Sequence, residues 1–414
     1  MHFRQLVGLL AAAAHFIVAD ANAGQNNSKK SNNGNNGQNK IRQESGVIKP
    51  FPGQGNGASN SRRANLDVSG LGSSLSDKDI IDLQFLPGKG SHRFKFEEHP
   101  GKSKANGEGK SWYGRTEPGT GDRGMTLNLL ESDETNLDGS PIYCGSVLDE
   151  EVGIYYQFCP DHNGDTVIIE TTEDEFGDEE EAEDETEVLD PDHVQRISPS
   201  RYRHLLERSV GGVGSDPTSL RGRRASSITF DDSGSTIDVM ILWTHEAECG
   251  NAGLDPGCSH NSQTEAVMRA RIALAVEEAN TAYALSGIDL VLRPVHTYRE
   301  PTGYVEYLDS SKSSIGSTAL RDIATEGDNL MDDVHFKRTQ YGADMVALIV
   351  NYGGGVAYRS TPTASIGSQF SVTGWVKATG RFTFAHELGR SKIPMQFHFF
   401  SLLCTRTHSF LVIF

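Results

Sequence analysis

Two adjacent residues near the end of the chain, His386 and Glu387, are of the types that a hydrolytic zinc site uses. On a helix, a second histidine four residues after His386 would direct its imidazole to the same face, so that two nitrogens could bind one Zn²⁺. Glu387 would lie beside the metal, where a glutamate can take a proton from zinc-bound water and deliver it to the leaving amine. A lone His-Glu pair is usually an ordinary surface pair, but this one follows a predicted strand and starts a predicted helix, which favours a zinc site.

The residues after Gly389 do not complete that site. In the extended pattern His-Glu-x-x-His-x-x-Gly-x-x-His, the second histidine, the glycine and the third histidine would stand where this chain has Arg390, Ile393 and Gln396. A guanidinium remains protonated at ordinary pH and cannot bind zinc. The chain therefore supplies one of three expected ligands, and a single imidazole cannot hold Zn²⁺ at the affinity of a tetrahedral site. We expect negligible peptidase activity from the 414-residue chain itself.

The elements that must position His386 belong to a folded unit at residues 236–389. Its hydrophobic pattern predicts strands at 237–243, 288–295, 343–350 and 370–376, and helices at 262–285, 318–324, 330–340 and 384–388. The helix at 262–285 is predicted to be amphipathic, with Gly287 as its C-cap. Strands that alternate with helices indicate an α/β (α+β) domain with a mixed, mostly parallel sheet.

Residues 79–172 have a different pattern. Short apolar runs at 80–86, 125–130, 154–158 and 166–171 are separated by clusters of Gly, Asp and Asn, which indicates a small all-β domain. We find no catalytic constellation in it. The segment before it, 24–78, is largely rich in Asn, Gly, Ser and Lys, and is predicted to be a disordered leader.

An acidic linker at 173–235 separates the two units. The chain has a formal net charge of −18, and the stretch 173–190 alone contains twelve acidic residues and no basic ones. Such a block is typical of a solvated, self-repelling linker, with binding of calcium or of a basic partner as the alternative. Because this stretch carries so much of the negative charge, the acidity says little about the folded units, and nothing in the composition suggests nucleic-acid binding.

The first residues have the pattern of a secretory signal peptide at 1–23. Arg4 supplies a positive charge, an apolar run follows at 6–18, and Ala21 and Ala23 supply the small residues of a cleavage site. The apolar run is shorter than the roughly 18 residues that a membrane helix needs. We therefore expect a secreted, extracellular protein without a membrane span.

A basic motif lies just before the second folded unit. Its residues Arg221, Arg223 and Arg224 match the Arg-x-Arg-Arg site of a proprotein convertase, whose acidic cleft binds several arginines on an extended segment. A chance basic cluster on the surface is the alternative. The position of the motif favours processing after Arg224 and hence a precursor.

Four of the five cysteines form two pairs at short spacing. In an exported chain, Cys144 with Cys159 and Cys249 with Cys258 are the disulfide candidates, and Cys404 is left over. Cys144 has an alternative interpretation, as a thiolate that caps the zinc ion.

Residues 236–389 resemble the adamalysin/reprolysin-like branch of the metzincin zinc metallopeptidases. The segments that carry the resemblance occur in the family's order: IDVMILW, AVEEANTAYALSGIDLVLRPVH, MDDVHFKRTQYGADMVALIV, GGGVAY and ATGRFTFAHELG. The resemblance implies a metzincin-like catalytic domain, a Zn²⁺ cofactor, a protein or peptide substrate, His386 as the first zinc ligand and Glu387 as the general base. It also implies that 79–172 is a β-rich prodomain and that 353–358 leads to an edge strand that pairs with the substrate backbone.

The resemblance stops at Arg390. Residues 390–414 contain neither a Met-turn nor the lower subdomain of that family, so we expect an incomplete catalytic domain and a non-homologous tail of gene-model origin, such as a retained intron. A true inactive relative, or a site rescued by His398 or His408, are the alternatives. Two hypotheses follow: the precursor of a secreted zinc metalloendopeptidase that is inactive as this truncated chain, or a catalytically dead secreted protein-binding scaffold of the same fold.

Overall fold

The structure is a computed structural model, and the part of the chain that it describes comprises residues 39–43, 62–67, 75, 79–84, 91–100, 109–116, 124–149, 151–172, 236–307, 315–351, 354–358 and 369–392. The predicted signal peptide and acidic linker lie outside these residues, as do Arg221, Arg223 and Arg224 and the tail after Lys392. All described residues belong to one compact unit, Gln38–Phe414.

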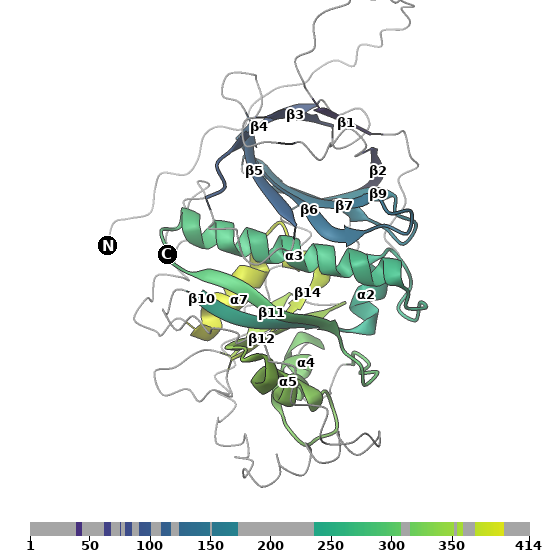
Figure 1. The fold of residues 1–414 in the computed structure, drawn as a ribbon, viewed down its shortest axis with the longest axis vertical. Helices are drawn as coiled ribbons and strands as arrows, with labels where there is room; N and C mark the ends of the chain where they lie inside the picture. Colours follow the sequence, from purple (N-terminus) through teal and green to yellow (C-terminus); the bar gives the residue numbers. More distant parts are fainter. Residues whose placement is uncertain are drawn as a thin grey trace, which may run out of the picture. The chain divides into compact units, whose positions relative to one another are not determined.

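The first half of the described chain forms a closed β-barrel (Figure 1). Its strands follow one another around the barrel in the order β1-β2-β9-β8-β7-β6-β5-β4-β3, and neighbours are antiparallel except for β1 and β3. Their bounds are β1 (Asn39–Gln43), β2 (Arg62–Asp67), β3 (Ile80–Leu83), β4 (His92–Glu97), β5 (Lys110–Thr116), β6 (Met125–Thr135), β7 (Pro141–Asp149), β8 (Ile154–Pro160) and β9 (Thr166–Thr172). Aromatic and aliphatic side chains such as Phe94, Phe96 and Trp112 fill the barrel core.

The structure differs from the sequence expectation within residues 24–78, which were predicted to be disordered. Two strands, β1 and β2, lie in this segment, and β2 pairs with β9 along a register from Arg62 opposite Glu170 to Asn65 opposite Val167. Ladder hydrogen bonds join backbone groups, so a polar strand can close a barrel without the apolar alternation that sequence patterns detect. The interpretation of the barrel as a prodomain stays a prediction.

The second half forms a sheet of five described strands in the order β11-β10-β12-β14-β13. Strand β10 is parallel to β11 and β12, strand β12 is parallel to β14, and only the short β13 is antiparallel. The strand bounds are β10 (Thr236–Trp243), β11 (Val291–Arg299), β12 (Met345–Val350), β13 (Gly355–Ala357) and β14 (Phe370–Gly374). The predicted α/β organisation and mostly parallel sheet are therefore confirmed.

Helices cover both faces of this sheet, and alternate residues of each strand face opposite ways. Val239, Ile241 and Trp243 of β10 pack in one core, whereas Met240 and Leu242 pack in the other. The helices are α2 (His245–Asn251), α3 (Ser262–Leu285), α4 (Ile315–Ala324), α5 (Asp333–Tyr341), α6 (Trp375–Ala378) and α7 (Thr383–Lys392). Helices α2, α3, α6 and α7 contribute to the first core, and α4 and α5 to the second. No helix in the described ranges is long and apolar enough to cross a bilayer.

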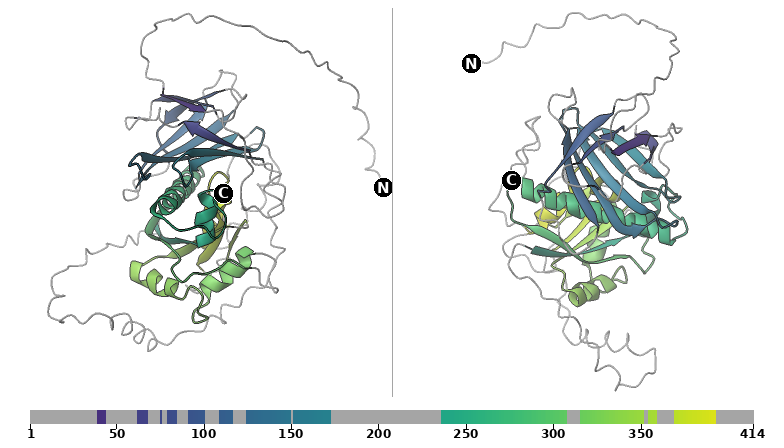
Figure 2. Two further views of the ribbon diagram at one scale, coloured as in Figure 1. Left: turned by 90° about the vertical axis from the view of Figure 1, so that its right-hand side faces the viewer. Right: turned by 45° about the horizontal axis from the view of Figure 1, so that its top comes forward.

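Helix α3 has the bounds that the sequence predicts, but it is covered on two faces. Met268 and Ile272 pack in the sheet core, whereas Val267, Ala270 and Leu274 pack against barrel side chains. Figure 1 shows α3 between strands β6 and β7 of the barrel and the sheet, and the views in Figure 2 agree. The barrel covers the face of α3 that would otherwise meet solvent. The predicted amphipathic pattern therefore accounts for only one of the two buried faces of this helix.

Candidate active site

Helix α7 carries His386 and Glu387 and is anchored in the sheet core by buried side chains and a hydrogen bond. Its side chains Phe384, Ala385 and Leu388 are buried in the sheet core. The hydroxyl of Tyr283 on α3 donates a hydrogen bond of 2.7 Å to the carbonyl oxygen of Ala385. Burial raises the pKa of Tyr283, so the hydroxyl remains a donor at any physiological pH. These contacts fix the depth and the rotation of α7.

The two predicted site residues lie in the first half of α7. His386 is half-buried and Glu387 is 3 % exposed. The backbone N–H of His386 donates to the carbonyl oxygen of Phe382 at 2.8 Å, in the turn where the helix begins. The roles of His386 as zinc ligand and Glu387 as base stay predictions, but both side chains lie on one element that the core holds in place.

Strand β13 lies directly beside Glu387. A Cβ atom added to Gly355 would lie 2.6 Å from both Cγ and Oε1 of Glu387, and 2.6 Å from Cγ2 of Thr383. These separations are far inside van der Waals contact, so the absence of a side chain at position 355 is what allows the strand to approach. Among the described strands, β13 pairs only with β14 and therefore forms the edge of the sheet. An extended peptide added to this edge would pass next to the Glu387 carboxylate.

The described residues do not bring a second zinc ligand to His386. Helix α7 continues to Lys392, so position 390 stands one turn after His386 on the same helix, and the residue there is arginine. Within the described ranges, the one group of His, Cys, Asp or Glu that is close enough to share a metal is His245, Cys249 and Cys258, which does not include His386. The residues present therefore do not fit the zinc site that the sequence pattern leads one to expect.

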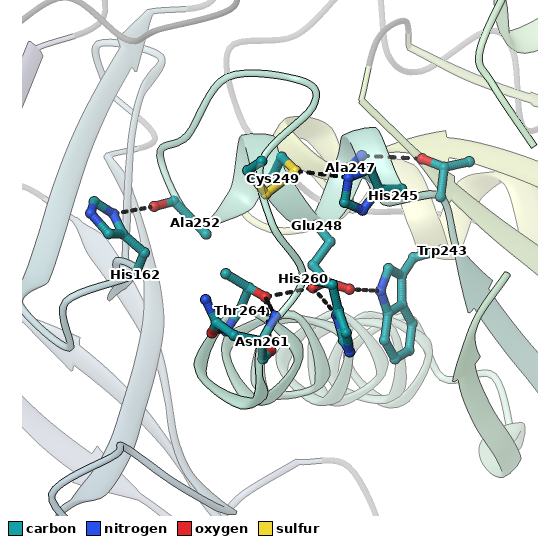
Figure 3. The surroundings of a disulfide bond; sticks show 12 residues. His162, Trp243, His245, Ala247, Glu248, Cys249, Ala252, His260, Asn261 and Thr264 are labelled. Atoms are coloured by element: carbon teal, nitrogen blue, oxygen red, sulfur yellow. Dashed lines mark hydrogen bonds and ion pairs between the residues drawn. A yellow bond between two sulfur atoms is a disulfide. The ribbon is translucent and has the colours of Figure 1, made fainter. Parts of the chain in front are cut away.

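The group at His245 is a disulfide with a neighbouring imidazole (Figure 3). Cys249 and Cys258 are joined to each other, and Nε2 of His245 lies 3.7 Å from Sγ of Cys249. Zinc binds cysteine as the thiolate, which a disulfide sulfur is not, so this group offers one imidazole in its oxidised form. It does not make up for the ligands missing near His386.

The other cysteine pair ties neighbouring barrel strands. Cys144 on β7 and Cys159 on β8 form a disulfide, and both are buried against α3. The alternative interpretation of Cys144 as a zinc-capping thiolate does not hold for the structure, because its sulfur is already bonded. Cys404 lies outside the described residues.

A buried carboxylate next to the disulfide fixes helix α2 (Figure 3). Glu248 accepts hydrogen bonds from Nε1 of Trp243 at 2.9 Å and from Oγ1 of Thr264 at 2.5 Å, and its Oε1 lies 2.6 Å from Nδ1 of His260. No sequence pattern pointed to this network, since Glu248 and His260 have the character of ordinary surface residues. The network joins α2, α3 and β10 to one another.

Comparisons with known proteins point to metallopeptidases. Residues 268–391 match the family model described as Metallo-peptidase family M12B Reprolysin-like. A peptidyl-Asp metalloendopeptidase of Xanthomonas campestris is 25% identical over 287 residues, which cover 67% of this chain and 55% of the relative. A peptidyl-Asp metalloendopeptidase of Stenotrophomonas maltophilia is 30% identical over 155 residues, which cover 37% of this chain and 32% of the relative. One from Pseudomonas aeruginosa is 30% identical over 174 residues, covering 38% of this chain and 24% of the relative.

The chain spans about half the length of the first of these relatives and a third or less of the other two. The matched segment begins within α3 and ends within α7, and it contains the sheet strands from β11 onward and both predicted site residues. The segment that carries His386 and Glu387 is therefore similar to the reprolysin-like metallopeptidases of family M12B, a zinc-dependent family, and the relatives that the chain resembles are named metalloendopeptidases.

Proposed function

We propose that this chain is the precursor of a secreted zinc-dependent metalloendopeptidase, and that in its 414-residue form it hydrolyses no peptide bonds. One observation carries the reaction class: the carboxylate of Glu387 is held against edge strand β13 by the close approach of Gly355. The relatives are named peptidyl-Asp metalloendopeptidases, and the proposal takes from that name only the class of reaction, hydrolysis of a peptide bond.

The geometry supports a substrate that binds as an additional strand. An extended peptide antiparallel or parallel to β13 would form backbone hydrogen bonds with the edge, and one of its peptide groups would come beside Glu387. In this position a carboxylate can act as general base toward an attacking water. Strand pairing uses backbone groups, so this mode sets the register of the substrate without selecting its sequence.

The proposal of inactivity rests on the ligand count. The chain offers His386 on α7, and Arg390 stands at the position one turn later. Three protein ligands are the usual minimum for a catalytic zinc site, so a lone imidazole gives too little affinity. The described residues of this chain therefore lack the ligands that a zinc-dependent step requires.

Secretion and processing complete the proposal. The disulfides Cys144–Cys159 and Cys249–Cys258 support an oxidising compartment such as the secretory pathway. The signal peptide 1–23 and the convertase site at Arg221, Arg223 and Arg224 rest on sequence pattern. The convertase is the partner that this pattern implies.

Zinc titration of the purified full-length chain tests both parts of the proposal. The wild-type chain should retain well under one zinc per chain after dialysis and should show no chelator-sensitive peptidase activity. Arg390→His adds an imidazole one turn after His386 and should tighten zinc binding by roughly ten-fold or more. The matched control Lys392→His adds an imidazole to the same helix on another face and should leave zinc binding unchanged.

The outcomes separate the two hypotheses. Equal zinc binding by the two variants would show that His386 is not a ligand position and would refute the zinc-peptidase assignment of α7. Stoichiometric zinc or chelator-sensitive hydrolysis in the wild-type chain would refute the proposal of inactivity. Tight binding of extended peptides by a zinc-free wild-type chain, without improvement of zinc affinity by Arg390→His, would favour the catalytically dead binding scaffold.

A further inference from the structure

The turn that starts the active-site helix is held by a side chain from the barrel. Gln157 on β8 is 1 % exposed, and its Nε2 donates hydrogen bonds to the carbonyl oxygens of Val376 at 2.9 Å and Thr379 at 2.5 Å. Val376 lies within α6, and Thr379 is the first residue of the turn at 379–382 that leads into α7. One glutamine of the barrel therefore binds the backbone just before α7.

A second barrel contact reaches the same turn through helix α3. Glu278 on α3 accepts a hydrogen bond from the backbone N–H of Gly380 at 2.7 Å and another from Oγ of Ser146 on β7 at 2.5 Å. Arg271, also on α3, donates to Oε1 of Gln157 at 3.2 Å and to Oγ1 of Thr379 at 3.1 Å. Each of these side chains is almost completely buried, so the hydrogen bonds have no competition from water.

Glu278 and Arg271 are both buried ionisable groups. Burial raises the pKa of Glu278 to about 7, against the hydrogen bonds from Ser146 and Gly380 and the charge of Arg271, all of which lower it. Burial lowers the pKa of Arg271 to about 10, so the guanidinium is still charged near neutral pH. Since an unpaired buried charge is costly, the network is stable only while the barrel is docked and all its members have partners.

The backbone of the turn needs this support. Gly380 has a φ of 85°, and Phe382 has a φ of 59°, in the left-handed region that side chains such as phenylalanine rarely adopt. Such a conformation persists where surrounding contacts fix it. A Cβ atom at Gly380 would lie 3.0 Å from Nε2 of Gln157, so the barrel glutamine packs directly on the turn. The carbonyl oxygen of Phe382 accepts a hydrogen bond from the backbone N–H of His386, so the conformation of the turn is linked directly to the position of His386.

We propose that the barrel is a built-in support for the active-site helix, and that Gln157 is the positioning residue through which it acts. Docking is extensive, since barrel side chains pack along α3 and His162 binds the carbonyl oxygen of Ala252 after α2 (Figure 3). The hydrogen bonds of Gln157, and those of Ser146 through Glu278, connect this interface to the turn before α7. The coupling is independent of zinc and holds whether or not the chain is an active peptidase.

Hydrogen exchange of the full-length chain tests the coupling, with a second interface glutamine as matched control. Gln157→Ala should speed the exchange of amides at 380–387 by about ten-fold or more, as expected for the loss of two buried hydrogen bonds. Gln263 on α3 is also 1 % exposed and also crosses the interface, because it accepts from the N–H of Leu137 and donates to Asn136. Gln263→Ala should leave exchange at 380–387 unchanged.

A conservative variant separates positioning from packing. Gln157→Glu keeps the volume of the side chain and the oxygen that accepts from Arg271, but it replaces the amide donor by a carboxylate facing two carbonyl oxygens. At pH 8 it should lose protection at 380–387 as Gln157→Ala does. Acidification to about pH 5 should restore part of that protection relative to the wild type, because a neutral carboxyl regains one donor.

Three results would overturn the proposal: wild-type protection of 380–387 in Gln157→Glu at pH 8, equal loss of protection in Gln263→Ala, or a loss in Gln157→Ala that spreads evenly over the sheet. If Gln157→Ala does not fold, Gln157→Glu, which keeps the volume, decides the question alone. A peptidase assay does not enter, so failure of the proposed function would leave this test intact.

Discussion

Gly355 is the residue at which one methyl group should disturb the candidate site most. A β-carbon at this position would lie 2.6 Å from three atoms of helix α7, two of Glu387 and one of Thr383. The neighbouring Gly354 is a close match for comparison, because a Cβ atom there meets nothing nearer than the end of the Lys377 side chain at 3.6 Å. Both glycines precede or begin the same edge strand β13.

The expected magnitude follows from this difference in space. Ordinary carbon contacts begin near ~3.5 Å, so Gly355→Ala must push β13 away from α7 by roughly 1 Å or displace the Glu387 side chain. Overpacking of this kind costs about 1–3 kcal/mol of the free energy of unfolding. Gly354→Ala requires no such movement and should change the free energy of unfolding by no more than about 0.5 kcal/mol.

Urea denaturation of the two variants and the wild-type chain measures these free energies, and hydrogen exchange of residues 355–357 and 383–387 locates the disturbance. We expect Gly355→Ala to be destabilised and to lose protection at both segments together. A Gly355→Ala variant as stable as Gly354→Ala, with unchanged exchange in α7, would show that β13 and Glu387 are not in contact. The strand-addition mode of substrate binding would then lose its structural basis.

Three further outcomes follow from buried groups near the site. The pKa of Glu278 is raised in the folded chain, to about 7 from 4.5, so the folded state holds this proton more tightly than the unfolded state. The contribution of Glu278 to the free energy of unfolding is therefore full below about pH 4.5 and is lost as the pH rises toward 7. Over this window, the difference in urea midpoint between the wild type and Glu278→Gln should fall. A constant difference would contradict the raised pKa of Glu278. Tyr283→Phe removes the hydrogen bond to the carbonyl oxygen of Ala385 and should lower the free energy of unfolding by about 1 kcal/mol. Thermal unfolding measures this loss, and an unchanged stability would show that the carbonyl finds another donor. Replacement of both Cys144 and Cys159 by serine opens a loop with a sequence separation of 15 and should lower the free energy of unfolding by roughly 3 kcal/mol, which reduction of the wild-type chain should match in part.

Local patterns in the sequence predicted much of the α/β domain. The bounds 262–285 of helix α3 agree with the structure because Asn261 caps its start and a left-handed Gly287 follows its end, and both are signals within a few residues of the helix. The buried strands β10 and β12 were recognised because a strand covered on both faces is continuously apolar. The predicted strand at 370–376 was too long, since the chain turns into α6 after Gly374.

The barrel was predicted less completely for the opposite reason. Strands β4, β5 and β7 were not identified, and β1 and β2 lie in a segment that composition marks as disordered. Closure of a barrel depends on pairings between strands distant in sequence, such as β2 with β9 and β1 with β3, and these pairings satisfy backbone groups irrespective of side-chain pattern. Short, polar strands therefore carry little local signal.

For the site, the sequence by itself determined the residue types, and with them the chemistry that is possible. His386, Glu387 and the arginine at position 390 are sufficient to recognise half of a zinc motif and to count its missing ligands. Tertiary structure alone decided what lies around them: Gly355 against Glu387, and Gln157 against a turn 222 residues later in the chain. Arg271 and Glu278 look like the solvated face of α3 in the sequence, and they are buried because the barrel docks there. Hydrophobic periodicity is a property of neighbouring residues, whereas the partner of a buried polar group is fixed only when distant surfaces meet.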